Sequence, residues 1–400
     1  MDSIKDIFII GNGPSSSHTM GPSFACQYIY KKYKNIEKVK VILFGSLAWT
    51  GKGHLTDTII QRFFDSHNIP CTIEFDYKTK PNHPNTLHFY VYADGKEMFE
   101  KIESTGGGTI LTNDSVKKEK EDIYLESKLK DILEVCKEED ISLYKYIVTH
   151  EDDDLFDYMS NALKAMDEAG KRGVETSGVL PGKLRVERKA HDLYIKGTYE
   201  TNKFIKEQLL VMAFAYAVSE ENASGGIVAT APTCGSAGVI PGVIEYLRLS
   251  HFNDDTIIES LIVGGLIGKI VKTNASVAGA VAGCQAEIGT ASAMGAAMIL
   301  HAFGFDNENI AQASEIALEH SLGLTCDPIQ GYVQIPCIER NAIFALKAIN
   351  SAALAMAIPT KSAKITFDDI VQTMYETGLD LQKGYRETSE KGMSKINISE

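Results

Sequence analysis

The sequence has few positive charges and no long uninterrupted apolar segment. Its 40 Lys and Arg residues are outnumbered by 53 Asp and Glu residues, so the formal net charge is −13. An acidic chain gains little from counterion release on a phosphate backbone, and we therefore expect no binding to nucleic acid. Residues 257–305 form the most apolar stretch, but Lys269, Lys272 and Glu287 interrupt it. We expect closely packed buried helices there and no membrane span.

The chain also lacks a secretory leader. Met1-Asp2-Ser3 leads directly into Ile-Lys-Asp-Ile-Phe-Ile-Ile, without a basic segment, a long apolar segment or a small-residue cleavage site. Seven cysteines in 400 residues without such a leader indicate reduced thiols rather than disulfides. We expect a cytoplasmic protein that acts on small molecules.

Cysteine pairs of the Cys-x-x-Cys type, which mark zinc ribbons and ferredoxins, are absent as well. Cys284, Cys326 and Cys337 are widely spaced, and composition alone favours buried core residues. Their contexts, Gly-Cys-Gln, Thr-Cys-Asp-Pro and Pro-Cys-Ile-Glu-Arg-Asn, contain small or turn-forming residues and favour accessible thiolates. Three thiolates suit an iron–sulfur cluster in which one iron stays open to act as a Lewis acid.

Apolar periodicity predicts an α/β domain in the first part of the chain. β-Branched and aromatic residues with partial alternation predict three strands of one sheet, at residues 39–44, 71–75 and 87–93. Residues 23–33 and 54–64 have helical spacing instead. We assign residues 1–112 to this domain and expect its sheet to be small and mixed.

A highly charged stretch with few apolar anchors follows, and we interpret residues 113–128 as a solvated linker. Beyond it helical periodicity dominates, so residues 129–400 are expected to form an all-helical domain. Helices are predicted at residues 129–136, 155–169, 204–219, 235–249, 256–271, 289–303, 308–322, 340–357 and 367–381. The predicted fold class is α+β, with an N-terminal α/β domain followed by an all-helical C-terminal domain.

A loop near the start of the chain is dense in hydroxyl groups. Between Gly11 and Pro22 it carries one imidazole and four hydroxyls, from Ser15, Ser16, Ser17, His18 and Thr19. Ser and Thr commonly cap helices, and such a loop could simply cap the helix after Pro22. Three serines beside a histidine exceed what a cap needs. We expect a polar substrate loop, because backbone N–H groups at a helix start suit a carboxylate and an imidazole exchanges protons near neutral pH.

A glycine-rich turn between residues 45 and 57 follows a predicted strand and opens a helix, a position that faces ligands in many α/β domains. It lacks both the Walker spacing and the three-glycine dinucleotide pattern. Lys52 and His54 are its candidate functional residues, although each could equally be a solvated turn residue.

Small polar residues also mark helix starts in the second part of the chain. Thr233, Asn274 and Ser276 could each hold a carboxylate there. Close helix packing through small residues is the alternative for most of their neighbours. Cys234 is either a fourth metal ligand or a thiol that lines the site.

Several motifs together resemble the iron–sulfur-dependent L-serine dehydratases. They are Gly-Pro-Ser-Ser-Ser-His-Thr-Met-Gly-Pro, Gly-Ser-Leu-x-x-Thr-Gly-Lys-Gly-His, Thr-Ala-Pro-Thr-Cys-Gly-Ser-Ala-Gly-Val-Ile-Pro-Gly, Gly-Cys-Gln-Ala-Glu-Ile-Gly, Leu-Gly-Leu-Thr-Cys-Asp-Pro and Val-Gln-Ile-Pro-Cys-Ile-Glu-Arg-Asn-Ala. The first motifs look like that family's β portion and the later ones like its α portion, joined here in one chain. The resemblance implies a [4Fe–4S] cluster on Cys284, Cys326 and Cys337, no pyridoxal phosphate, and conversion of L-serine to pyruvate and ammonia. We also expect a homodimer.

The elimination suggests roles for the candidate residues. A base must remove the Cα proton while the hydroxyl leaves, and donors must hold the carboxylate. We assign proton handling to His18 and His54, with Ser17 and Thr19 beside them, and leave the identity of the base open. The residues assigned to substrate binding are Ser15, Ser16, Lys52, Thr233, Asn274 and Ser276.

One departure from the family pattern bears on the substrate. Gly279-Ala280-Val281 stands where the family is expected to have Gly-Ala-Glu, so a carboxylate beside the cluster is missing. A lyase acting on L-threonine or L-cysteine is therefore an alternative. A pyridoxal-phosphate lyase using Lys52 and a non-catalytic sensor of amino acids or iron–sulfur status are the other readings.

Overall fold

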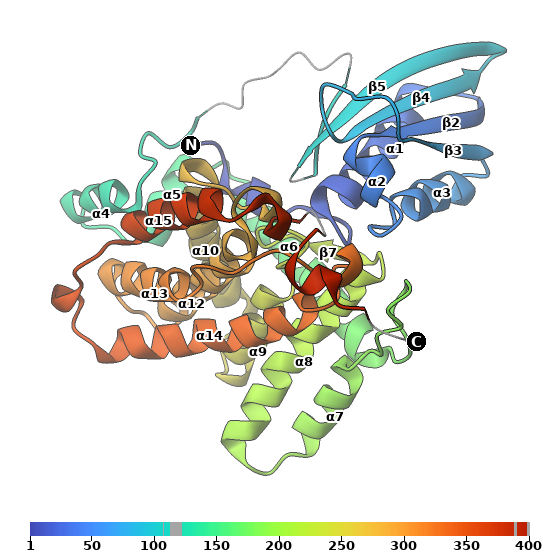
Figure 1. Ribbon diagram of the computed structural model, residues 1–400. Helices are drawn as coiled ribbons and strands as arrows, with labels where there is room; N and C mark the ends of the chain where they lie inside the picture. The colour runs from blue at the N-terminus through green and yellow to red at the C-terminus, as the bar shows by residue number, and fades with distance from the viewer. Residues whose placement is uncertain (107, 113–121, 388–389, 398–400) are drawn as a thin grey trace. The chain divides into compact units, whose positions relative to one another are not determined.

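The computed structural model describes residues 1–106, 108–112, 122–387 and 390–397. The chain forms two compact units (Figure 1). Unit 1 comprises Met1–Ile10, Lys120–Glu221 and Val228–Glu400, and unit 2 comprises Gly11–Glu119 and Asn222–Ile227. Of the expected linker, residues 113–121 lie outside the described residues, and residues 122–128 belong to unit 1.

Unit 2 is built on a five-stranded mixed sheet with strand order β3-β2-β4-β5-β6. Its strands are β2 (Ile36–Phe44), β3 (Cys71–Asp76), β4 (Thr86–Ala93), β5 (Lys96–Gly106) and β6 (Thr109–Leu111). β2 and β3 run parallel, and the other neighbours are antiparallel. The three predicted strands are confirmed, and so is the mixed sheet.

Buried and exposed side chains alternate along β2, which explains how this sheet packs against its helices. Val39, Val41 and Leu43 are buried, while the residues between them are more exposed. The buried side chains pack against apolar residues of α1 (Gly21–Lys32) and α3 (Thr56–Ser66). The short helix α2 (Ser46–Thr50) follows β2 directly. The predicted helices at residues 23–33 and 54–64 correspond to α1 and α3.

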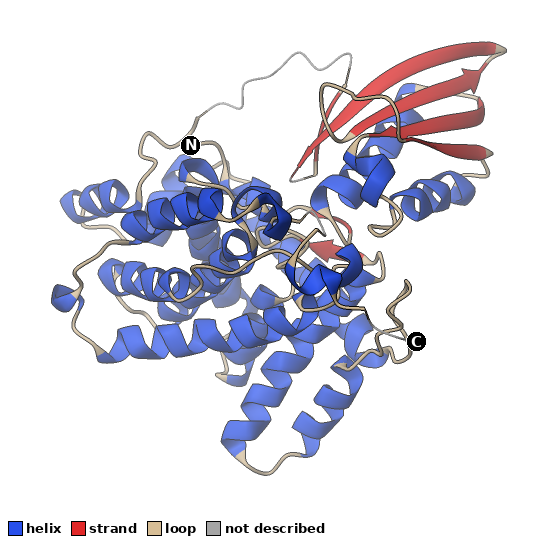
Figure 2. Cartoon of the chain, viewed as in Figure 1, coloured by secondary structure: helices blue, strands red, loops and turns tan. Residues whose placement is uncertain are grey.

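Unit 1 is almost entirely helical, as Figure 2 shows. Its helices are α4 (Leu129–Glu138), α5 (Leu143–His150), α6 (Leu155–Glu175), α7 (Ala190–Tyr199), α8 (Lys203–Ala223), α9 (Val239–Leu249), α10 (Asp254–Asn274), α11 (Gly279–Ala282), α12 (Thr290–Ala302), α13 (Asn307–Glu319), α14 (Cys337–Ala357) and α15 (Phe367–Asp380). All nine predicted helices are present. Two short strands, β1 (Ile10–Asn12) and β7 (Ile227–Ala229), pair to form a separate two-stranded sheet.

Single helical turns complete the chain. They are η1 (Ile4–Ile7), η2 (Ser16–Met20), η3 (Gln285–Gly289), η4 (Ile329–Gly331), η5 (Thr360–Ser362), η6 (Lys383–Tyr385) and η7 (Gly392–Lys395). Two of them, η2 and η3, are π-turns, and each lies at a predicted functional motif.

The centre of unit 1 is formed by α10 and α12. Residues 260–271 and 290–300 are buried on every side of their helices, which explains why this stretch is so apolar. Glycines let the two helices approach closely: a Cβ at Gly264 would lie 2.9 Å from Met298 Cγ. In the part of the chain that the structure describes, no helix combines the length and the hydrophobicity needed to cross a membrane.

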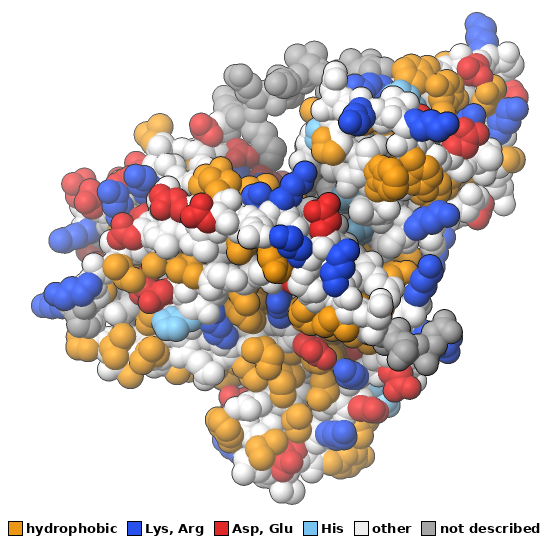
Figure 3. All heavy atoms as spheres, in the orientation of Figure 1, with side chains coloured by type: hydrophobic (Ala, Val, Ile, Leu, Met, Phe, Trp, Pro, Cys, Tyr) orange, Lys and Arg blue, Asp and Glu red, His pale blue; other side chains and the backbone are white. Residues whose placement is uncertain are grey.

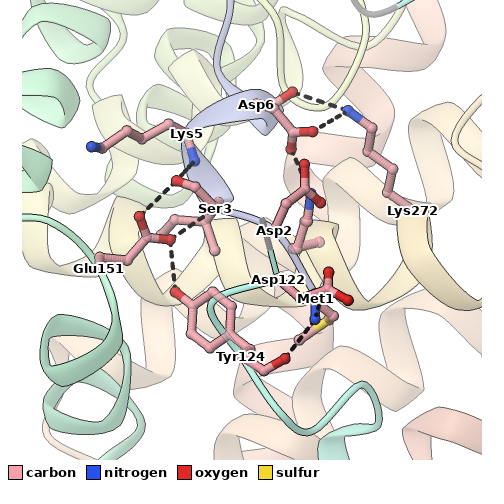
Figure 4. Close-up of polar contacts among 11 residues, drawn as sticks. Met1, Asp2, Ser3, Lys5, Asp6, Asp122, Tyr124, Glu151 and Lys272 are labelled. Atoms are coloured by element: carbon pink, nitrogen blue, oxygen red, sulfur yellow. Dashed lines mark hydrogen bonds and ion pairs between the residues drawn. The ribbon is translucent and has the colours of Figure 1, made fainter. Parts of the chain in front are cut away.

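The first residues of the chain belong to the helical core. The Met1 ammonium group donates to Tyr124 O at 2.6 Å (Figure 4). Asp6 accepts from Lys272 Nζ at 2.9 Å and from Lys269 Nζ at 3.0 Å. Lys269 is only 1% exposed, so its charge is stable in the core only because carboxylates neutralise it. These long-range contacts explain why residues 1–10 are part of unit 1.

Candidate functional site

The three predicted thiol ligands lie in unit 1, at or near the starts of helical elements. Cys284 immediately precedes η3, Cys326 lies in the loop before η4, and Cys337 is the first residue of α14. Cys284 is 4% exposed and Cys326 is 8% exposed, and both belong to one apolar cluster. The expectation that these two thiols are accessible is wrong: small neighbours let the surrounding helices close over them.

The thiols lie close enough to affect one another's ionisation. Burial raises the pKa of Cys284 to about 11 and raises the pKa of Cys326 well above its ordinary value. The pKa of Cys337 is also raised, first by burial and then by Cys284. Arg340 hydrogen-bonds Cys284 and opposes the shift there. A metal bound here would have to displace the thiol protons, since thiolates bind metals and neutral thiols do not.

A carboxyl group that the sequence analysis missed stands beside the thiols. Glu287 Oε1 accepts a hydrogen bond from Thr233 Oγ1 at 2.7 Å, and Cys326 Sγ donates weakly to Oε2 at 3.9 Å. Burial, reinforced by Glu387, raises the pKa of Glu287 to about 7. Glu287 therefore supplies a carboxyl group near the thiols in a chain that has Val281 where one was expected. The sequence did contain a signal for Glu287, because this residue follows Cys284 by three positions in the Gly-Cys-Gln-Ala-Glu motif.

Two glycines leave room for this carboxyl group. A Cβ at Gly279 would lie 2.5 Å from Glu287 Oε2 and 2.9 Å from Cys326 Sγ. A Cβ at Gly235 would lie 3.0 Å from Glu287 Oε1. A Cβ at Gly279 would force the carboxyl group or the thiol to move, whereas a Cβ at Gly235 would require a shift of only a few tenths of an ångström.

The C-terminal segment braces the loop that carries Cys326. Cys326 N donates to Tyr385 O at 2.8 Å, and Glu387 N donates to Cys326 O at 2.6 Å. Further along, Met393 N donates to Asp327 Oδ2 at 2.7 Å. Tyr385, Glu387 and Met393 thus hold the backbone around one thiol.

Arg340 and Asn341 fix the start of α14. Arg340 Nη1 donates to Thr325 O at 2.7 Å, next to Cys326. The Asn341 amide accepts from Gly238 N at 2.9 Å and donates to Gly235 O at 2.8 Å. Cys337 is therefore held by side chains one turn further along its own helix.

The three thiols are the residues whose chemistry suits an iron–sulfur cluster. Among the described residues, no three His, Cys, Asp or Glu side chains converge closely enough to hold one metal ion. In a [4Fe–4S] cluster each cysteine binds a different iron, so the three sulfurs need not meet at one point. Thiols around one arginine suit such a group, and Cys284, Cys326 and Cys337 are the residues that would hold it.

In unit 2 the two candidate histidines form a stacked pair. The ring centroids of His18 and His54 are 4.7 Å apart, and both side chains are buried. Burial lowers the pKa of His18 well below its ordinary value, and His54 adds to this; burial also lowers the pKa of His54. Both rings are therefore neutral near pH 7.

The hydrogen bonds around the pair define one ring's tautomer. His54 Nδ1 lies 3.1 Å from Thr50 O, which can only accept, so Nδ1 carries the proton and Nε2 keeps its lone pair. His18 lies between two hydroxyls, with Ser17 Oγ 2.9 Å from Nδ1 and Ser46 Oγ 2.8 Å from Nε2. A neutral ring with a free Nε2 can accept a proton, which makes His54 the better base of the two.

The hydroxyl-rich loop partly serves its own fold. Ser15 Oγ accepts from His18 N at 3.2 Å and caps η2, and Ser16 begins that turn. Thr19 Oγ1 donates to His54 O at 2.7 Å and so ties the loop to the glycine-rich turn. The structure therefore brings Ser15, Ser16, Ser17, His18, Thr19 and His54 into one cluster.

The remaining candidates differ in what they contact. Thr233 reaches the thiol site through Glu287, and Cys234 beside it is buried. Asn274 Nδ2 donates to two backbone carbonyls, and Ser276 Oγ accepts from Ala278 N at 3.1 Å, so both serve local structure. Lys52 is exposed, with Nζ 5.1 Å from the centre of the Phe75 ring.

Both units therefore carry buried titratable groups with shifted pKa values: thiols and a carboxyl group in unit 1, and a neutral imidazole pair in unit 2. Such groups concentrate at catalytic sites, and the arrangement is that of an enzyme with acid–base chemistry.

Comparison with known proteins agrees. The family model of the serine dehydratase alpha chain matches residues 97–394, and that of the beta chain matches residues 3–67. L-serine dehydratase 2 of Escherichia coli (strain K12) is 36% identical over 98% of each chain. The L-serine dehydratases of Haemophilus influenzae and Helicobacter pylori are 34% and 36% identical, over 98% of this chain and 99% and 98% of their own. The chain belongs to the serine dehydratase family, with alpha- and beta-chain regions in one polypeptide.

Proposed function

We propose that the protein is an iron–sulfur-dependent lyase that deaminates L-serine to pyruvate and ammonia, acting in the cytoplasm as a homodimer. The observation that carries the proposal is the group of three thiols around Arg340, the buried Cys284 and Cys326 and the half-buried Cys337, in a chain whose relatives are named L-serine dehydratase. In this proposal residues 1–112 act as the β-like part, 113–128 as the linker, and 129–400 as the α-like part with the cofactor.

The reaction removes water from serine and then adds it back. The Cα proton and the β-hydroxyl leave to give 2-aminoacrylate, whose imine form is hydrolysed to pyruvate and ammonia. When bound, a [4Fe–4S] cluster held by three cysteines supplies an open iron, a Lewis acid for the departing hydroxyl. Side chains of the protein must remove the Cα proton and orient the substrate.

Proton removal is assigned to the histidine pair. The Cα–H bond is weakly acidic, so the base must be unprotonated at neutral pH and close to a hydrogen-bonding partner that fixes its orientation. His54 meets both conditions through its lowered pKa and its bond to Thr50 O. His18, between Ser17 and Ser46, is assigned to relaying protons beside it.

Substrate orientation is assigned to the hydroxyl-rich loop and to Thr233. Ser15, Ser16 and Ser17 offer donors for a carboxylate, and Thr19 fixes the loop against the histidine turn. Thr233 holds the Glu287 carboxyl group in place. The weaker candidates for binding are Lys52, Asn274 and Ser276.

Anaerobic reconstitution with iron and sulfide tests the proposal directly. Reconstituted protein should make pyruvate from L-serine, and Cys326→Ala should abolish turnover and lower the iron and sulfide bound per chain. Cys71→Ala, which changes a free thiol of unit 2, is the matched control. This variant should keep both the turnover of L-serine and the iron and sulfide content of the wild-type protein. Full activity in metal-free protein contradicts the proposal.

The same assay separates the alternatives. Higher kcat/KM on L-threonine or L-cysteine than on L-serine would change the substrate, with the same elimination chemistry. Visible absorbance and iron content distinguish an iron–sulfur protein from a pyridoxal-phosphate lyase. A loaded protein that turns over none of these amino acids would indicate a sensor.

A further inference from the structure

Two carboxyl groups beside the thiols of unit 1 have no contact with the substrate in the proposed mechanism. They belong to Glu287 and Glu387, whose side chains are both half-buried. The two groups lie close enough for the charge of Glu387 to raise the pKa of Glu287. Within the described residues, neither carboxyl forms an ion pair with a Lys, Arg or His side chain. The surface of unit 1 in Figure 3 differs, because acidic and basic side chains lie interspersed there.

We propose that Glu287 and Glu387 together bind the α-ammonium group of the amino-acid substrate and so select amino acids over carboxylic acids that lack this group. The inference rests on the proposed function, which requires an amino acid as substrate but assigns no residue to its ammonium group. Like charges in a partly buried site repel, and the pair is stabilised when a cation lies against both. An ammonium group has three N–H donors, enough to give one to each carboxylate.

One oxygen of Glu287 is available to such a donor. Oε1 already accepts from Thr233 Oγ1 at 2.7 Å, whereas Oε2 has only the Cys326 thiol, with Sγ 3.9 Å away. Sγ can donate only as a neutral thiol, so a metal bound to Cys326 would remove even this weak donor. Oε2 would then face an added negative charge and would need another donor.

Glu387 is placed beside Glu287 by the C-terminal segment. Its N–H donates to Cys326 O at 2.6 Å, and its carboxyl accepts from the backbone N–H of Ala280 in α11. Ala280 directly precedes Val281, the position at which the family pattern leads us to expect a carboxylate. The φ angle of Glu387 is +57°, a left-handed conformation that few non-glycine residues adopt. Glycine would adopt it without strain, so a glutamate here indicates that the site uses the side chain.

The cation already present at the thiols does not meet the needs of both acids. Arg340 hydrogen-bonds Cys284 and donates to Thr325 O at 2.7 Å. It attracts Glu287 without forming an ion pair, and among the described residues no cation lowers the pKa of Glu387. With the thiols neutral, two carboxylates and one guanidinium leave a formal charge of −1. A single ammonium group would neutralise that charge.

Binding of this kind predicts discrimination against ligands without the ammonium group. A site built to hydrogen-bond a polar group rejects an analogue that lacks it, because the acceptors of the site then stay unpaired. L-Alanine and propionate share one carbon skeleton and one carboxylate, and they differ only in the α-ammonium group. Neither carries a β-hydroxyl that could leave, so neither is turned over by the proposed reaction.

Titration calorimetry of anaerobically reconstituted protein measures the discrimination. Wild-type protein should bind L-alanine at least tenfold more tightly than propionate. Glu387→Gln keeps the size of the side chain and an oxygen that can accept from Ala280 N. It should reduce the preference at least fivefold by weakening L-alanine alone, and Glu287→Gln should act in the same direction. Glu376→Gln is the control, because Glu376 is an exposed residue of α15 paired with Gln372, and it should keep the wild-type preference.

The ratio of the two affinities is the readout, because damage to the fold or loss of iron would weaken both ligands together. Equal affinities of the wild-type protein for L-alanine and propionate overturn the inference. So does a preference that survives Glu387→Gln at native iron content, or a loss of iron in Glu387→Gln that weakens both ligands equally.

The pyruvate assay separates this result from the proposed function. A protein that loses its preference for L-alanine in both glutamine variants, but makes no pyruvate from L-serine, upholds the ammonium site and contradicts the lyase. A protein that makes pyruvate without any such preference does the reverse.

Discussion

Replacing Asn341 with alanine removes the side chain that fastens the first turn of α14 to the segment before α9. Asn341 is 1% exposed, and its amide bonds Gly238 N, Gly235 O and Cys337 O at 2.9, 2.8 and 2.9 Å. The alanine variant leaves a buried donor and a buried acceptor without this partner. Because α14 begins at Cys337, the variant tests whether the fold that holds this thiol depends on one amide.

The expected cost follows from those groups. Each buried donor or acceptor left unsatisfied costs about 1–3 kcal/mol, so two of them cost about 4 kcal/mol in the middle of the range. The Cys337 carbonyl keeps its place in the helix and adds little. A loss of this size is a large part of the 5–15 kcal/mol by which domains are typically stable. The melting temperature of unit 1 should fall by roughly 5–10 °C.

Thermal unfolding followed by far-ultraviolet circular dichroism measures this shift. Asn161→Ala is the control, because Asn161 is exposed and its amide bonds only a carbonyl of its own helix, with an expected effect within about 0.5 kcal/mol. Equal melting temperatures for the two variants would refute the reasoning, because the buried amide would then contribute no more than an exposed one.

Two further predictions concern pH and steric fit. Burial holds the pKa of both stacked histidines below the ordinary 6.5, so only the unfolded chain gains protons as the pH falls below 6.5. Below pH 6.5 the free energy of unfolding of unit 2 should fall by up to about 1.4 kcal/mol per pH unit for each histidine. His54→Gln should therefore reduce the slope of melting temperature against pH. An unchanged slope would contradict this reasoning. Gly279→Ala places a Cβ 2.5 Å from Glu287 Oε2 and 2.9 Å from Cys326 Sγ, and it should lower the iron bound after reconstitution at least fivefold. Gly53→Ala is the control, because the nearest atom to its Cβ is Thr50 O at 3.4 Å, and it should not lower the iron content. Equal iron contents would show that the thiol site tolerates the methyl group.

Strand and helix positions were largely predictable because their signals are local. Alternation along residues 39–44 and 87–93 reflects one buried face of β2 and β4, and helical spacing gave nine helices of unit 1. β5 was missed because Lys96–Gly106 carries charged residues on a strand with one solvent-facing side. α5 was missed because it spans only 8 residues, and α7 was missed because it buries only Ala190 and Gly197 and so has no apolar stripe.

The candidate site was only partly predictable for a different reason. The three cysteines and the two histidines stand in unusual motifs, so the sequence pointed to them directly. Glu287 looked like an ordinary charged residue, because Thr233, its hydrogen-bond partner, is 54 positions away. Asn274 looked like a ligand-binding residue, but its amide is occupied by backbone carbonyls.

The sequence by itself determined the family, the hydroxyl-rich loop and most of the strands and helices, because each is written in contiguous residues. Tertiary structure alone decided that Cys284 and Cys326 are buried, that Glu287 stands beside them, and that residues 1–10 complete the helical core. The burial of a side chain and the hydrogen-bond partners of a polar group depend on residues far apart in the sequence. They are therefore fixed only when the folded chain packs those residues together.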